Sequence, residues 1–198
     1  MSAYSEEYVH GLLAENERLR SQVDGVKAEA EAKVTNLACL YVAVTSVHGA
    51  IDRPTVLSSV QEIVTNLIGC EEMAIFETDA ANGRLTLLAS TGIDPGPYQE
   101  VSIGDGAIGR AAATGERLVR QDGGSLTVGG DEALTACIPL KVGGRVIGVL
   151  AVFRLLPHKG RLDSVDLDLF DVLAAHAASS LLFTRLYAEA DGVIGAGA

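Results

Sequence analysis

The sequence has no tryptophan, and its 198 residues include only five tyrosines and four phenylalanines. Few rings are therefore available to stack against nucleic-acid bases. Basic residues are also scarce, since 15 lysines and arginines stand against 26 aspartates and glutamates, which gives a formal net charge of -11. This charge repels phosphate backbones and anionic lipid headgroups, and no basic patch interrupts it. We expect neither nucleic acid nor a membrane as a partner.

Long apolar runs are missing as well. No stretch approaches the roughly 18 apolar residues of a membrane-spanning helix. The first ten residues, MSAYSEEYVH, carry acids where a secretory signal carries bases. The sequence therefore predicts a cytoplasmic protein.

The cysteines and histidines lack the spacing of metal-binding and redox motifs. Cys39, Cys70 and Cys137 are far apart and form no Cys-x-x-Cys motif, so we expect buried reduced thiols. The four histidines are scattered without ligand spacing: His10, His48, His158 and His176. We expect no metal and no cofactor.

Residues 133–155, ALTACIPLKVGGRVIGVLAVFRL, form the most informative stretch that is present. Its second half, from Val146 to Phe153, is an apolar, β-branched run without alternation, which is typical of a strand covered on both faces. Gly143 and Gly144 can both take positive φ, as a two-residue hairpin turn requires. The stretch predicts an antiparallel hairpin whose second strand is central in the sheet.

The N-terminal region repeats apolar residues at alternating spacings of four and three from about residue 12 to residue 47, which is a heptad pattern. Asn16 at a core position can be satisfied by its counterpart in a parallel dimer. A single amphipathic helix lying on its own domain is the other interpretation, and we expect a coiled coil over 8–34 followed by a domain-packing helix to about 49. The predicted dimerisation residues are Leu12, Asn16, Leu19, Val23, Val26, Ala30, Leu37, Leu40 and Val44.

The remaining elements follow from periodicity and turn residues. We expect helices at 55–68, capped by Asp52, at a short Ala-rich segment ended by Gly115, and from Asp163 or Ser164 to about 190. We expect strands at 73–78, 84–90, 100–103 and 118–120, and a weakly structured connection at 121–132. The chain thus divides into a coiled-coil helix (1–35), one domain (36–190) and a disordered tail (191–198).

Five short motifs occur in an order that resembles the GAF domain family over residues 36–187. They are Phe76-Glu77-Thr78-Asp79, Gly106-Ala107-Ile108-Gly109-Arg110 running on to Thr114-Gly115-Glu116, Ile138-Pro139-Leu140, Gly143-Gly144, and Val146-Ile147-Gly148-Val149-Leu150. The resemblance implies an α+β fold, in which long N- and C-terminal helices cover one face of an antiparallel sheet of five or six strands. It also implies that loops on the other face enclose a small molecule, and that the domain senses or dimerises.

The resemblance does not extend to the special chemistry of some relatives. Residues 160–171, GRLDSVDLDLFD, lack the Asn-Lys and Asp-Glu pairs of cyclic-nucleotide-binding members. No cysteine lies in a bilin-attachment motif, and the cysteine motif of the branch that reduces free methionine sulfoxide is missing. We therefore expect a protein that is not an enzyme.

The expected ligand site lies on the sheet face opposite the long helices. Its predicted residues are Phe76, Leu118, Arg120, Ser125, Thr127, Thr135, Cys137 and Phe153. Arg120 is the only fixed positive charge among them, so it would receive an acidic ligand. The Gly-rich segment 122–131 would either cover this site as a lid or mark a collapsed pocket.

Two classes of function remain. In the first, a cytoplasmic signalling domain homodimerises, binds a small molecule and shifts its helices, with its output delivered to a separate protein. In the second, a ligand-free scaffold recruits partners, for instance as an adaptor in a polar or motility complex. A lined cavity of a few hundred Å³ would favour the first, and side chains that fill that volume would favour the second.

Overall fold

The computed structural model describes residues 8–27, 41, 52–120, 126–128 and 130–195. It separates the chain into two units, Met1–Tyr41 and Val42–Ala198. This division lies a few residues after the boundary at residue 35 that the sequence predicts.

In the first unit, residues 8–27 form a helix. The predicted dimerisation residues that lie within it, Leu12, Asn16, Leu19, Val23 and Val26, are all exposed. A coiled coil needs a second helix to cover these side chains, so it stays a prediction. The other predicted dimerisation residues, Ala30, Leu37, Leu40 and Val44, lie outside the described residues.

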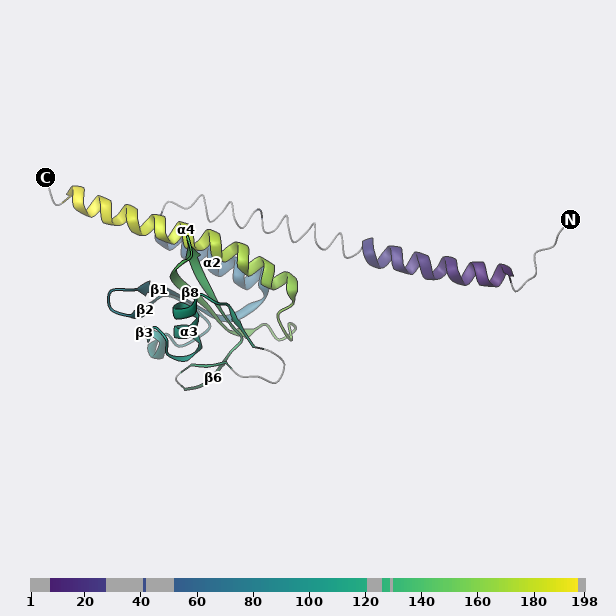
Figure 1. The fold of residues 1–198 in the computed structure, drawn as a ribbon, viewed down its shortest axis with the longest axis horizontal. Coiled ribbons are helices and arrows are strands. Elements are labelled where there is room, and N and C mark those ends of the chain that lie inside the picture. The colour runs from purple at the N-terminus through teal and green to yellow at the C-terminus, as the bar shows by residue number, and fades with distance from the viewer. Residues whose placement is uncertain (1–7, 28–40, 42–51, 121–125, 129, 196–198) are drawn as a thin grey trace. The chain divides into compact units, whose positions relative to one another are not determined.

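The second unit is built on a six-stranded antiparallel sheet in the order β3-β2-β1-β8-β7-β4 (Figure 1). The strands are β1 (Cys70–Asp79), β2 (Arg84–Thr91), β3 (Glu100–Ser102), β4 (Leu118–Val119), β7 (Ala136–Val142) and β8 (Arg145–Leu155). The predicted antiparallel sheet of five or six strands is confirmed.

The predicted central hairpin is present as β7 and β8. Gly143 (φ 56°) and Gly144 (φ 82°) form the turn, in a backbone conformation that residues other than glycine rarely adopt. β8 lies between β1 and β7, as its unbroken apolar run predicts. At Gly148 a Cβ atom would lie 2.3 Å from the carbonyl oxygen of Phe76, so the backbone of β1 passes too close for any side chain.

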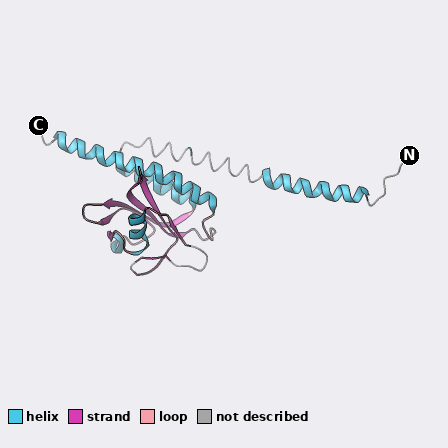
Figure 2. Cartoon of the chain, viewed as in Figure 1, coloured by secondary structure: helices cyan, strands magenta, loops and turns pink. Residues whose placement is uncertain are grey.

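Two long helices cover one face of the sheet (Figures 1 and 2). They are α2 (Arg53–Ile63), which continues into the π-helical turn η1 (Val64–Ile68), and α4 (Ser164–Gly195). Asp52 caps α2 as predicted, because its Oδ1 accepts a hydrogen bond of 2.9 Å from the amide of Thr55. Asp163 and Asp166 each accept a bond of 2.9 Å from the other's amide, which is a reciprocal cap at the start of α4.

α4 extends beyond its predicted end near residue 190 and reaches Gly195, because adding a residue to a formed helix costs little. The predicted tail 191–198 is therefore helical through residue 195. Between Ser164 and Ala188 the helix is long and apolar enough to cross a membrane by length and composition alone. Half of its most apolar window is nevertheless buried in the domain, as in helices that pack on a sheet.

The opposite face of the sheet carries α3 (Gly106–Thr114), the 3₁₀ turn η2 (Gly96–Tyr98) and a ribbon of β5 (Leu126–Val128) and β6 (Gly130–Leu134). Gly115 ends α3 with φ 68°, as predicted. The prediction of a weakly structured connection over 121–132 is wrong where the structure describes it. Leu126, Thr127 and Val128 have side chains that favour strands, and the surrounding glycines obscured this short signal.

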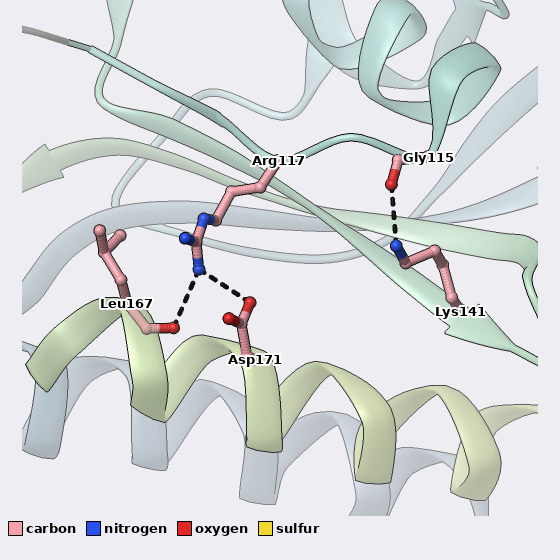
Figure 3. Close-up of polar contacts among 5 residues, drawn as sticks. All are labelled: Gly115, Arg117, Lys141, Leu167 and Asp171. Atoms are coloured by element: carbon pink, nitrogen blue, oxygen red, sulfur yellow. Dashed lines mark hydrogen bonds and ion pairs between the residues drawn. The ribbon is translucent and has the colours of Figure 1, made fainter. Parts of the chain in front are cut away.

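At the edge of the sheet, the side chains of Arg117 and Lys141 link the sheet to the helices on its two faces (Figure 3). The guanidinium of Arg117 donates to the carbonyl of Leu167 (3.1 Å) and the carboxylate of Asp171 (2.8 Å), both on α4. The ammonium of Lys141, on β7, donates to the carbonyl of Gly115 at the end of α3 (2.9 Å). The edge strand β4 and the helix α3 are therefore fixed relative to β7 and α4.

Candidate functional site

The α3-facing side of the sheet, where the ligand site is predicted, is packed with side chains. Phe76 and Cys137 are fully buried there, Phe153 is 5% exposed, and Leu118 packs against the same cluster. The rings of Tyr98 and Phe153 meet edge to face with centroids 5.0 Å apart. Four of the eight predicted ligand residues thus help to fill this face.

A cleft of about 540 Å³ opens beside this packed cluster, at the end of β8. It brings together three of the predicted residues, Arg120, Thr135 and Phe153. Its volume is within the range of small-molecule sites. The remaining lining residues are Glu72, Arg154, Leu155, Leu156, Pro157, Lys159 and Gly160.

Backbone hydrogen bonds hold the floor of the cleft in place. The amide of Thr135 donates to the carbonyl of Val152, and its hydroxyl donates to the carbonyl of Phe153, each at 2.8 Å. The amide of Arg120 donates to the carbonyl of Thr135 at 2.8 Å. Arg120 follows β4 directly, so its backbone is fixed while its side chain is exposed at the rim.

Most of the cleft residues that the sequence did not predict come from the loop after β8, and the others lie on β1 (Glu72) and at the end of β8 (Arg154 and Leu155). The amide of Leu156 donates to the carbonyl of Gly69 at 2.8 Å, which brings this loop back beside the start of β1. Residues 157–162 were recognisable as a loop, but a contact between segments so far apart in sequence leaves no local signal. Arg154, at the end of the predicted central strand, was the one residue that the pattern could have suggested.

Most of the charge around the cleft is paired. The guanidinium of Arg154 binds the carboxylate of Glu71 (2.9 Å) and that of Glu72. The ammonium of Lys159 binds the buried carboxylate of Asp166 at 2.5 Å. Among the side chains that the structure describes, which exclude those of residues 121–133, the guanidinium of Arg120 has no carboxylate partner.

The two described cysteines are poor candidates for thiol chemistry. Burial raises the pKa of the Cys137 thiol to about 12, and it raises the pKa of the Cys70 thiol to about 12 despite the opposing charge of Lys159. Both thiols are therefore protonated near neutral pH, whereas the thiolate is the nucleophile. Cys39 lies outside the described residues.

Two predicted site residues cannot be placed as side chains. Ser125 lies outside the described residues, and Thr127 is placed only by its backbone, on β5. The described part of the predicted lid forms the β5–β6 ribbon. No group of three or more potential metal ligands occurs among the residues whose positions are described.

Comparison with known proteins supports the fold. The family model for the GAF domain matches residues 53–182. A search of curated protein sequences finds no match.

Three solved structures illustrate the likeness. The GAF domain of a phosphoenolpyruvate-protein phosphotransferase from Coxiella burnetii is 18% identical, with a TM-score of 0.66 over 78% of this chain and 96% of that chain. Residues 122 to 287 of a methyl-accepting chemotaxis protein are 19% identical, with a TM-score of 0.58 over 73% of this chain and 98% of that chain. The free methionine-R-sulfoxide reductase of Neisseria meningitidis, in complex with its substrate, is 20% identical, with a TM-score of 0.62 over 77% of this chain and 91% of that chain. At these identities the likeness shows the fold alone.

Proposed function

Because this chain belongs to the GAF domain family, whose members generally mediate sensing or signalling, we propose that it is a non-enzymatic, cytoplasmic signalling protein. It homodimerises through its helices and passes the state of its sheet domain to a separate partner protein. A small molecule bound in the cleft at the end of β8 sets that state.

The exposed apolar stripe on α4 is the observation that carries this proposal. Phe183, Leu186 and Tyr187 are each more than half exposed, and the rings of Phe183 and Tyr187 stack with centroids 6.1 Å apart. Upstream, Val172, His176, Ser179, Phe183 and Leu186 alternate in steps of four and three, the spacing of a coiled-coil seam. Such a stripe favours a second helix as its cover.

The helix 8–27 presents a comparable stripe, which includes Leu12, Leu19, Val23 and Val26. The α4 stripe and the stripe on this helix both need cover, and a parallel homodimer supplies it with identical surfaces. In such a dimer a change in the sheet domain reaches the partner protein as a change in helix geometry.

A ligand-free scaffold is the second candidate, with a partner such as a component of a polar or motility complex. The packed cluster of Phe76, Cys137, Phe153 and Tyr98 favours it, because these side chains occupy the face where a ligand was expected. Native mass spectrometry of the protein purified from its own source separates the candidates. A retained small molecule supports the sensor, whereas an empty dimer with a co-purifying protein supports the scaffold.

A thiol-based reductase is the least favoured function, although one of the similar folds belongs to a methionine sulfoxide reductase. Cys70 and Cys137 are buried, and their raised pKa values keep them protonated. Neither supplies the partly exposed thiolate that such chemistry needs.

The dimer is tested by placing charge on both stripes at once. We expect the double variant Val23→Glu/Leu186→Glu to dissociate, because each glutamate would be desolvated in a helix seam. The matched control, Ser21→Glu/Ala188→Glu, adds the same charges two residues away on helix surfaces that face away from the seams. Light scattering coupled to gel filtration measures the mass of each.

The predicted result is a dimer for the unmodified chain and for the control, and a monomer for the stripe variant, with its dissociation constant raised at least about tenfold. A monomeric unmodified chain would overturn the proposal. A stripe variant that remains as dimeric as the control would show that other surfaces hold the dimer.

A further inference from the structure

The cleft at the end of β8 contains one unmatched cation among matched charges. Arg154 is shared by Glu71 and Glu72, and Lys159 is held by Asp166. Each of these cations is already neutralised by a carboxylate. Arg120 lines the same cleft and has no such partner among the side chains that the structure describes, which exclude those of residues 121–133. Of these three cations, Arg120 is therefore the one that can receive a further negative group without displacing a described ion pair.

The lining of the cleft is mainly polar and also includes apolar side chains. Phe153 contributes a nearly buried ring, and Leu155 and Leu156 contribute half-buried side chains. An inorganic ion would leave the exposed parts of Leu155 and Leu156 in contact with water. A molecule with an apolar body and one acidic group would cover them while its acid met the guanidinium, which presents a planar pair of donors suited to carboxylates and phosphates.

We infer that the cleft binds a small organic acid, with its carboxylate or phosphate on Arg120 and its apolar body against Phe153, Leu155 and Leu156. The inference rests on the proposed function, because it names the class of ligand that the proposed sensor detects. It also separates the ligand site from the α3-facing side of the sheet, which the packed cluster already fills.

One residue that lines this cleft forms an ion pair with the first turn of α4. Lys159 lines the cleft, and its ammonium binds Asp166 in the first turn of α4 at 2.5 Å. Asp166 in turn accepts a hydrogen bond from the amide of Asp163, which caps the helix. A ligand in the cleft therefore contacts the segment that fixes the start of the helix carrying the exposed apolar stripe.

The test is an NMR titration of the full-length, isotope-labelled chain with benzoate, which carries one carboxylate on a flat apolar body. Benzamide is the matched probe, since it has the same shape without the charge. Arg120→Gln removes the proposed anion contact. Arg145→Gln is the control variant, because Arg145 is also exposed but begins β8 next to the β7–β8 turn, at the other end of both strands.

We expect benzoate to shift the amides of Thr135, Arg154 and Lys159 in a saturable way, with benzamide at least about tenfold weaker. Arg120→Gln weakens benzoate binding about tenfold or more, and Arg145→Gln leaves it unchanged. Equal binding by Arg120→Gln, equal binding of benzamide, or no saturable shift up to ~10 mM benzoate would each overturn the inference. A chain that is dimeric but fails this titration loses only this inference, whereas a monomeric chain contradicts the proposed dimer.

Discussion

Phe153 is part of both the packed cluster and the lining of the cleft. Its ring meets Tyr98 edge to face in the packed cluster, while the same residue lines the cleft. The packing of one side chain therefore determines both the stability of the α3-facing layer and the floor of the ligand site. We therefore expect a substitution at Phe153 to lower the free energy of unfolding.

Replacement of Phe153 by alanine should lower the free energy of unfolding by about 3–5 kcal/mol, because a buried ring is lost and a cavity remains. Phe153→Leu keeps most of the apolar volume and should cost about 1–1.5 kcal/mol. Urea unfolding at one fixed protein concentration measures both values. A loss below about 1 kcal/mol for the alanine variant would show that the face is loosely packed and open to a ligand.

The buried thiols give a second prediction, with a definite sign in pH. The pKa of each thiol is raised from 9.0 to about 12 in the folded protein, so the folded state keeps its proton where the unfolded state loses it. Stability should be unaffected by these groups below pH 9 and should fall as the pH rises from 9 towards 12.

Alkylation measures the same property directly. In a Cys39→Ser background, iodoacetamide at pH 8 should leave Cys70 and Cys137 unmodified in the folded protein and should modify both in urea. Mass spectrometry counts the modified thiols. Rapid alkylation of either thiol in the folded chain would revive the reductase as a candidate function.

The sequence placed four of the eight site side chains on the packed face but could not say whether they line a cavity or fill it. The resemblance to the GAF family implied that Phe76, Cys137 and Phe153 lie on the side opposite the long helices. Whether room remains there depends on Tyr98 and Ile108, which arrive from segments distant in sequence. Volume is a property of the assembled core, so a pattern in one strand cannot report it.

At the scale of elements, one carboxylate joins two helices to the sheet. Glu77, near the end of β1, binds Arg53 at the start of α2 and lies 3.6 Å from the guanidinium of Arg185 on α4. All three side chains are between about a fifth and a third exposed. The two helices that cover the sheet therefore share an anchor on its central region.

Replacement of Glu77 by alanine should destabilise the protein by about 1–2 kcal/mol, between the effects typical of exposed and of buried ion pairs. The partly buried guanidinium of Arg53 would lose its ion pair, and Arg185 would lose its contact with Glu77. The control is Glu100→Ala, which breaks the more exposed pair with Arg84 and should cost less than about 0.5 kcal/mol. Urea unfolding compares the two, and equal losses would show that the Glu77 anchor contributes nothing particular.

Elements with strong local signals were predicted well, and weak ones were not. The glycine pair at the hairpin, the Asp52 cap and the αL glycine after α3 are each decided within a few residues. The β5–β6 ribbon was missed because its strands are short and lie among glycines. The cleft was predicted only in part, because its second wall forms where the loop after β8 returns to β1.

For the whole molecule, the fold leaves two apolar helical stripes that a single described unit does not cover. The stripe on the helix 8–27 and the stripe on α4 belong to the two ends of the chain, and the sheet domain lies between them in sequence. In the proposed function the sheet domain is therefore the detector, and the helices carry the output. The heptad spacing was readable from the sequence, whereas the identity of its partner helix was not.

The most direct measurement is the distance between two copies of α4 in the intact chain. Spin labels at Ser179→Cys and, separately, at Leu186→Cys, in a background without the native cysteines, report this distance by pulsed dipolar spectroscopy. Short and nearly equal distances are expected at both positions, set by helix axes about 8–10 Å apart and by the label tethers. The absence of coupling between chains, or coupling at only one of the two positions, would contradict parallel pairing of α4 and with it the proposed route of the signal.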